Sequence, residues 1–169
     1  MVEAKQTMNG NRSIAVSSQT TPMTPLKFDD LESAFYWVSG AGPFENLAYV
    51  SRATGQIYWI SDESEGDEKI PDAIEDGTLY LAVPHKNDLE LGRSLVFEFV
   101  DEYLPDSIHK VRTIFSKRGA YSRFKDLLED RNLLERWYEF ERDATEKALR
   151  RWANENGFEL SAPIRKIGS

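Results

Sequence analysis

Apolar residues recur at helical spacing from Asn87 almost to the end of the chain, and this pattern constrains the fold more than any other feature. Four successive stripes cover residues 91–103, 108–115, 121–128 and 133–152. Each stripe repeats large apolar side chains three or four positions apart, which is typical of an amphipathic helix. Pro105 fits the first turn of the second helix, Gly119 ends that helix, and Asn156-Gly157 is an end signal for the last one. We therefore expect the C-terminal half to be a set of packed helices.

The N-terminal half carries strand signals instead. Residues 47–51 and 56–60 are rich in aromatic and β-branched side chains and flank a turn in which Gly55 can take a positive φ, which predicts a β-hairpin. Residues 78–83 predict a third strand, and residues 31–38 a short helix with Asp29 or Asp30 as its cap. The expected class is α+β: a small antiparallel sheet, made of the hairpin plus one strand, packed with four to five helices.

The length of 169 residues fits one domain with a sizeable core. Residues 1–25 are rich in Thr, Ser, Asn and Gln and hold few large apolar residues, so they cannot offset the entropy of ordering themselves. We expect a flexible N-terminal tail over residues 1–25. The single α+β domain is then predicted at residues 26–160, and a C-terminal tail at residues 161–169.

Composition excludes several classes of site. The chain has no cysteine, which rules out disulfides, thiolate metal sites and cysteine nucleophiles. A net charge of -8 argues against broad, non-specific affinity for nucleic acid. No apolar run approaches a membrane span, and the N-terminus lacks the pattern of a secretory signal, so we expect a cytoplasmic protein without a membrane partner.

The acidic run at residues 62–68 does not match a calcium-binding loop, because the sixth position from Asp62 is Asp67 where a glycine is needed. A solvated linker is the expected structure there. No metal and no cofactor are predicted for the chain.

Three features of the C-terminal half follow one another in a recognisable order. They are a Gly-Ala-aromatic turn that leads into an Arg-Phe-Lys helix start, both within residues 117–126, then a Trp-Tyr-x-Phe helix at residues 134–140, and then its closing tryptophan within residues 148–152. In this order they resemble the signature of a bacterial group known as uncharacterised protein family 0158. The hairpin at Thr54-Gly55 and the strand before Pro84 are also similar to that family, so the resemblance covers roughly residues 29–160. Tyr121 departs from it, since phenylalanine is more usual there.

The resemblance implies a bacterial protein with this fold, but the family carries no established activity, cofactor or catalytic residue to transfer. Patterns for catalysis are also sparse in the chain itself. The two histidines, His85 and His109, lie in no nucleophile motif, and residues 40–43 lack the lysine of a phosphate-binding loop. The abundant Asp and Glu leave a carboxylate-dependent hydrolase or transferase as an open alternative.

One basic segment opposes the negative charge of the chain. Lysines and arginines recur over residues 110–125 across the Gly119 turn, with the outline of a helix-turn-helix. One interpretation is a nucleic-acid contact in which Arg118 and Arg123 bind phosphate. Another is an ion-paired surface, because acidic residues follow on the same helix and Lys125 can pair with Glu129 at i,i+4.

A third interpretation is a protein-docking surface, since Arg, Trp and Tyr are enriched at interface hot spots. Trp137 can equally belong to the core. The leading hypothesis is a non-enzymatic interaction or regulatory protein whose partner is another protein, with a homodimer left open; mimicry of nucleic acid by the acidic surface ranks last. The candidate interaction surface comprises Arg118, Gly119, Tyr121, Arg123, Lys125, Trp137 and Tyr138.

Overall fold

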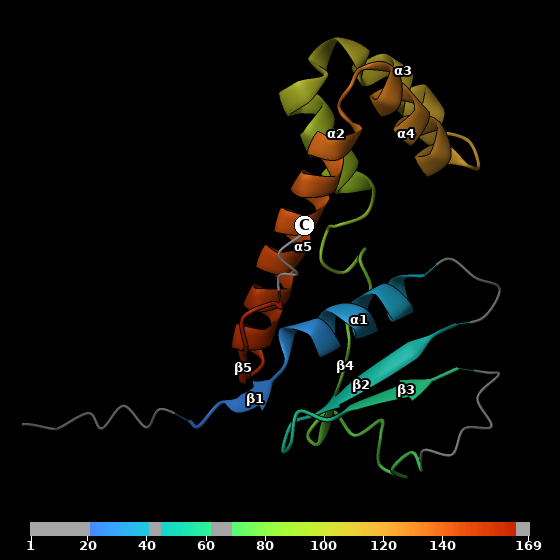
Figure 1. Ribbon diagram of the computed structural model, residues 1–169. Coiled ribbons are helices and arrows are strands. Elements are labelled where there is room, and N and C mark those ends of the chain that lie inside the picture. Colours follow the sequence, from blue (N-terminus) through green and yellow to red (C-terminus); the bar gives the residue numbers. More distant parts are fainter. Residues whose placement is uncertain (1–20, 41–44, 62–68, 165–169) are drawn as a thin grey trace, which may run out of the picture.

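The computed structural model describes residues 21–40, 45–61 and 69–164. Figure 1 shows two lobes joined by the long helix α5 (Leu134–Glu155), which runs from the upper lobe to the lower one. The described part confirms the α+β class: it holds five α-helices, mostly C-terminal, a three-stranded antiparallel sheet and a small parallel strand pair. Within these residues, no helix is both long and apolar enough to cross a membrane.

The lower lobe, here called the sheet lobe, contains the predicted hairpin. Strands β2 (Leu47–Ser51) and β3 (Ile57–Ile60) pair antiparallel, and β4 (Tyr80–Ala82) pairs with the other edge of β2. The third strand is therefore confirmed, although it is shorter than predicted. Gly55 has a φ of 75°, and a Cβ there would collide with the carbonyl oxygen of Pro25. Only glycine suits both the turn and this close approach.

Helix α1 (Phe28–Ser39) packs on this sheet through Leu31, Ala34 and Phe35. The predicted cap is wrong, because the N-cap position is Lys27 and no side chain caps it. Asp29 and Asp30 instead lie in the first turn, where their charges suit the helix dipole.

A parallel pair of three-residue strands was not predicted. Strand β1 (Thr24–Leu26) pairs with β5 (Phe158–Leu160), so Thr24 and Pro25 belong to a strand although the sequence places them in the N-terminal tail. The hydroxyl of Thr24 donates to the carbonyl of Arg52 over 2.6 Å, which ties β1 to the hairpin. Such short strands show no alternating pattern, and their partners lie at the opposite end of the chain.

The upper lobe, here called the helix lobe, contains the predicted C-terminal helices. They are α2 (Arg93–Tyr103), a 3-10 turn at Pro105–Ser107, α3 (Ile108–Phe115), α4 (Ala120–Asp130) and the first half of α5. Trp137 is only 1% exposed and meets Phe99 and Phe124 edge to face, with ring centroids 5.3 and 5.2 Å away. Its Nε1 has no hydrogen-bond partner among the described residues.

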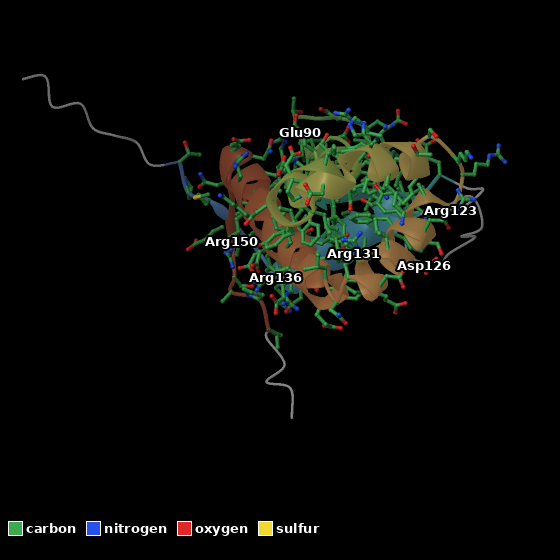
Figure 2. The ribbon with its side chains drawn as sticks, turned by 90° about the horizontal axis from the view of Figure 1, so that it is seen from above. Glu90, Arg123, Asp126, Arg131, Arg136 and Arg150 are labelled. Carbon is green, nitrogen blue, oxygen red and sulfur yellow. The ribbon has the colours of Figure 1, made fainter. Side chains whose placement is uncertain are left out.

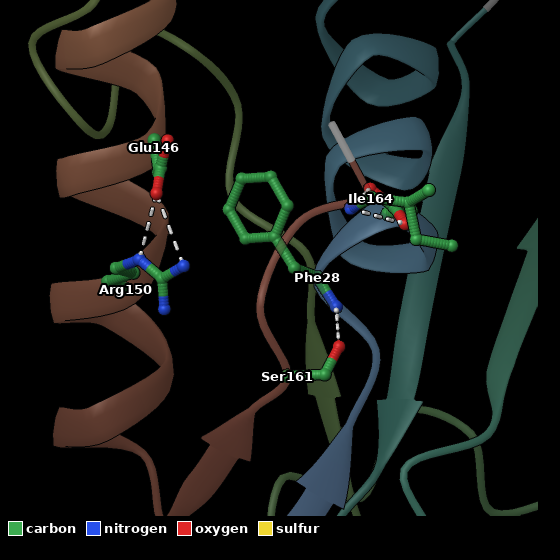
Figure 3. A network of polar contacts seen from close by, with 6 residues as sticks. Phe28, Glu146, Arg150, Ser161 and Ile164 are labelled. Carbon is green, nitrogen blue, oxygen red and sulfur yellow. Dashed lines mark hydrogen bonds and ion pairs between the residues drawn. The ribbon is translucent and has the colours of Figure 1, made fainter. Parts of the chain in front are cut away.

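The second half of α5 belongs to the sheet lobe, where Leu149 and Ala153 join the core. Figure 3 shows how this half is fastened to the start of α1. The Arg150 guanidinium pairs with Glu146 over 3.2 Å and lies 5.4 Å from the Phe28 ring centroid. The backbone N–H of Phe28 donates to the Ser161 hydroxyl over 3.2 Å, so residues just past the predicted domain end also contact α1. Helix α5 is thus part of both hydrophobic cores.

Candidate functional site

The predicted basic turn lies between α3 and α4. Gly119 has a φ of 73° and a ψ of 22°, a left-handed conformation that reverses the chain before α4 begins at Ala120. Arg118 and Gly119 are both exposed at this turn. The turn therefore exists as predicted, and its cations face solvent.

Within the part of the chain that the structure describes, no residue of the basic run takes part in an ion pair. The two ion pairs that the described residues form within 4 Å are Arg136 with Glu139 and Arg150 with Glu146, and neither belongs to the run. The expected pair of Lys125 with Glu129 is therefore wrong. Lys125 instead places its Nζ 5.5 Å from the ring centroid of Tyr138 on α5. The cation rests on an aromatic face, which attracts it without neutralising it.

Helix α4 separates the predicted surface into two sides. With 100° of rotation per residue, Arg123 and Lys125 lie about 160° apart around the helix, whereas Tyr121 and Lys125 lie about 40° apart. Figure 2 shows Arg123 and Asp126 at the same edge of the molecule. Tyr121, Lys125 and Tyr138 therefore form one side, and Arg123 lies on another. Trp137 is in the core and does not contribute to either surface.

Tyr121 is the centre of the first side. It is 38% exposed and packs edge to face on Phe115 with centroids 5.1 Å apart. The Lys86 Nζ lies over its ring at 5.0 Å. Burial raises the pKa of the Tyr121 hydroxyl, and the charge of Glu141 raises it further while Arg93 lowers it. Arg93 in turn lies 5.3 Å from the ring centroid of Phe97.

Glu141 on α5 lies among these cations. Burial raises the pKa of its carboxyl, and the charges of Lys125 and Lys86 act in the opposite direction. Its side chain forms no hydrogen bond or ion pair with the residues that the structure describes. Lysines on two different segments thus surround one half-buried carboxylate.

We call this arrangement the Tyr121 face. It comprises Lys86, Arg93, Tyr121, Lys125, Tyr138 and Glu141. Sequence reasoning found Tyr121, Lys125 and Tyr138 but missed the other three. The signal for Lys86 and Arg93 is the aromatic ring that each cation contacts, Tyr121 and Phe97 respectively. For Lys86 this contact joins segments that are distant in the sequence, so the sequence alone does not reveal it.

The two histidines have ordinary surroundings. The His85 Nδ1 accepts a hydrogen bond from the backbone N–H of Asn87 over 3.1 Å, so this ring stabilises a turn. His109 is exposed on α3. The acidic run at residues 62–68 lies outside the described residues. Among those that are described, no group of three or more His, Asp or Glu side chains is arranged to hold a metal ion.

Carboxylates do converge at one other place. A cavity of about 410 Å³ is lined by Asp29, Glu32, Asp143 and Glu146 together with Arg142. Burial raises the pKa of Glu32, as do the charges of Asp29 and Glu146. However, Asp29 accepts from the backbone N–H of Ile164, and Glu146 pairs with Arg150. Two of the four carboxylates are thus engaged in fastening the fold.

A larger cavity of about 660 Å³ lies along the β1–β5 pair and the hairpin turn. Its charged lining residues are Lys27, Asp30 and Glu159, and these belong to no cation–aromatic contact. The Tyr121 face is therefore the stronger candidate site, since it concentrates cations that form no ion pair within 4 Å with any described residue.

Comparison with known proteins places the chain in a family without adding an activity. No curated protein and no solved structure gives a significant match. One family model does match, and it covers residues 30–164, which include the helix lobe, most of the sheet lobe and the whole Tyr121 face. The chain therefore belongs to the Uncharacterised protein family (UPF0158), as the turn and tryptophan signature of its C-terminal half indicates.

Proposed function

We propose that this chain is a non-enzymatic interaction protein that binds an acidic segment of a partner protein on the Tyr121 face. One observation carries the proposal: the cations of this face rest on aromatic rings and have no acidic partner within 4 Å among the described residues. Their charge is thus available to an incoming carboxylate. An exposed aromatic beside such a cation also supplies contact area with little loss of side-chain freedom.

A protein partner fits this face better than a nucleic acid. Glu141 interacts with both Lys86 and Lys125, and α4 carries exposed Asp126, Glu129 and Asp130. A regular array of phosphates would meet these negative charges, and the whole chain adds a net charge of -8. An acidic peptide carries its carboxylates at discrete positions and can avoid Glu141. Complementary charge of this kind mainly raises the association rate and selects the partner.

The experiment is a fluorescence-anisotropy titration with a labelled, glutamate-rich peptide as the probe, beside labelled single- and double-stranded DNA and RNA of similar length. The unmodified chain is compared with the double variant Lys86→Glu, Lys125→Glu. The matched control is Arg131→Glu, Lys147→Glu, which changes net charge equally at two exposed positions outside the face.

We expect the peptide to bind the unmodified chain and the control variant, and to lose at least about tenfold in affinity with the face variant. Equal binding by both variants would show that the face is not the site. Nucleic-acid binding that exceeds peptide binding and falls steeply with salt would replace the proposal by the nucleic-acid alternative.

A further inference from the structure

A small pocket opens beside the Tyr121 face, where the two lobes meet. Its volume is about 220 Å³. Helix α1 contributes Phe35, Tyr36 and Ser39, α5 contributes Glu141 and Thr145, and the segment before α2 contributes Lys86 and Leu91. A cavity of this size suits one side chain rather than a cofactor or a metabolite.

The pocket and the face are continuous because Lys86 and Glu141 belong to both. The backbone N–H of Lys86 donates to the Ser39 hydroxyl over 2.9 Å, which fixes this residue against α1. Tyr36, another lining residue, is also affected by Glu141: burial raises the pKa of its hydroxyl, as do the charges of Glu32 and Glu141. A peptide lying on the cations therefore has the pocket directly beside it.

The lining of the pocket selects among side chains. Phe35 is buried and Leu91 half-buried, so the pocket favours an apolar body. Glu141 offers a half-buried carboxylate that forms no hydrogen bond or ion pair with the described residues. A purely aliphatic side chain would leave that carboxylate desolvated and unpaired, and an Asp or Glu would bring a second negative charge against it inside the pocket. A Lys or Arg would pair with Glu141 but would add a positive charge beside Lys86 and Lys125.

We propose that this pocket receives a tyrosine side chain of the acidic partner segment, with its ring against Phe35 and Leu91 and its hydroxyl donating a hydrogen bond to Glu141. The inference rests on the proposed function, because the neighbouring carboxylates of the segment dock on Lys86 and Lys125. A neutral side chain with an apolar body and one polar tip can contact the apolar lining and also donate a hydrogen bond to the carboxylate. Such an anchor in a central pocket with charged contacts around it is typical of interface hot spots.

The test uses three labelled acidic peptides that have glutamates on each side of one central residue and differ only there, with Tyr, Phe or Ala. Anisotropy is measured with the unmodified chain, with Ser39→Leu, which fills the pocket, and with Ser39→Ala, which removes the same hydroxyl without filling it. Circular dichroism and the affinity of the Ala peptide establish that each variant is folded.

We expect the Phe peptide to bind at least about tenfold more tightly than the Ala peptide, and the Tyr peptide at least about fivefold more tightly than the Phe peptide. Both preferences should vanish in Ser39→Leu and persist in Ser39→Ala. Equal binding of all three peptides to the unmodified chain would overturn the pocket while leaving the acidic-partner proposal intact. Equal Tyr and Phe binding would overturn the hydrogen bond to Glu141, and absence of binding by every peptide would refute the proposed function itself.

Discussion

Replacing Trp137 by phenylalanine tests the packing described for the core of the helix lobe. The indole is 1% exposed, and its Nε1 meets no hydrogen-bond partner in the part of the chain that the structure describes. Trp137→Phe leaves an added void of about 40 Å³, which costs about 1 kcal/mol at the usual cavity penalty. The substitution also removes a buried donor whose missing hydrogen bond costs about 1–3 kcal/mol. The two effects oppose each other, so we expect the free energy of unfolding to stay unchanged or to rise by up to about 2 kcal/mol.

The comparison variant is Trp137→Ala, which deletes the contacts with Phe99 and Phe124 as well. It should lower the free energy of unfolding by about 3–5 kcal/mol. Urea denaturation followed by far-ultraviolet circular dichroism measures both values, and with a slope of about 2 kcal/mol per molar urea the alanine variant shifts the midpoint by roughly 2 M. If Trp137→Phe instead costs more than about 3 kcal/mol, the indole N–H has a stabilising partner and the description of this core is wrong.

Three further predictions concern other parts of the chain. Gly119→Ala should lower the free energy of unfolding by about 1–2 kcal/mol in urea denaturation, because nothing crowds the new Cβ and only the left-handed backbone opposes the substitution. Asparagine tolerates this conformation better, so Gly119→Asn should cost less. Equal costs would contradict this cause. Since the pKa of Glu141 is raised in the folded chain, folding stability should rise as pH falls from neutral through that raised pKa and level off below the ordinary value. Urea midpoints across that range should lose this slope in Glu141→Gln, and an unchanged slope would refute the assignment. Arg150→Met should lower the free energy of unfolding by about 0.5–1.5 kcal/mol, because it removes the cation from Phe28 and from Glu146. An unchanged midpoint of thermal unfolding would show that these contacts do not stabilise the fold.

Local patterns were enough to predict most elements of the fold. The hairpin, the third strand and the C-terminal helices each show their own periodicity within a few residues, and the structure confirms them. The parallel pair β1–β5 was missed because three residues are too few to show a period. The cap of α1 was misplaced for a related reason: Asp29 and Asp30 fit a cap and a first turn equally well.

The candidate site was only partly predictable. Tyr121, Lys125 and Tyr138 stand close together in the sequence, so a basic and aromatic cluster could be noticed. Lys86 and Glu141 are separated by more than one helix, and only the packing of α5 against the segment before α2 brings them together. Trp137 was placed on the candidate surface although it is buried, because helical spacing alone does not reveal which aromatic of a stripe reaches the core.

The strand pair also sets the order in which this protein can be completed during synthesis. The backbone N–H of Phe28 meets the Ser161 hydroxyl across a separation of 133 residues, and β1 pairs with β5 beside that contact. Residues of the helix lobe contact one another over short separations and can fold as they emerge from the ribosome. The sheet lobe begins with β1 and α1, yet it lacks β5 and the end of α5 until the whole helix lobe has been translated. A nascent chain therefore carries an incomplete sheet-lobe core while the helix lobe is being made, and β5 then completes the core that β1 and α1 began.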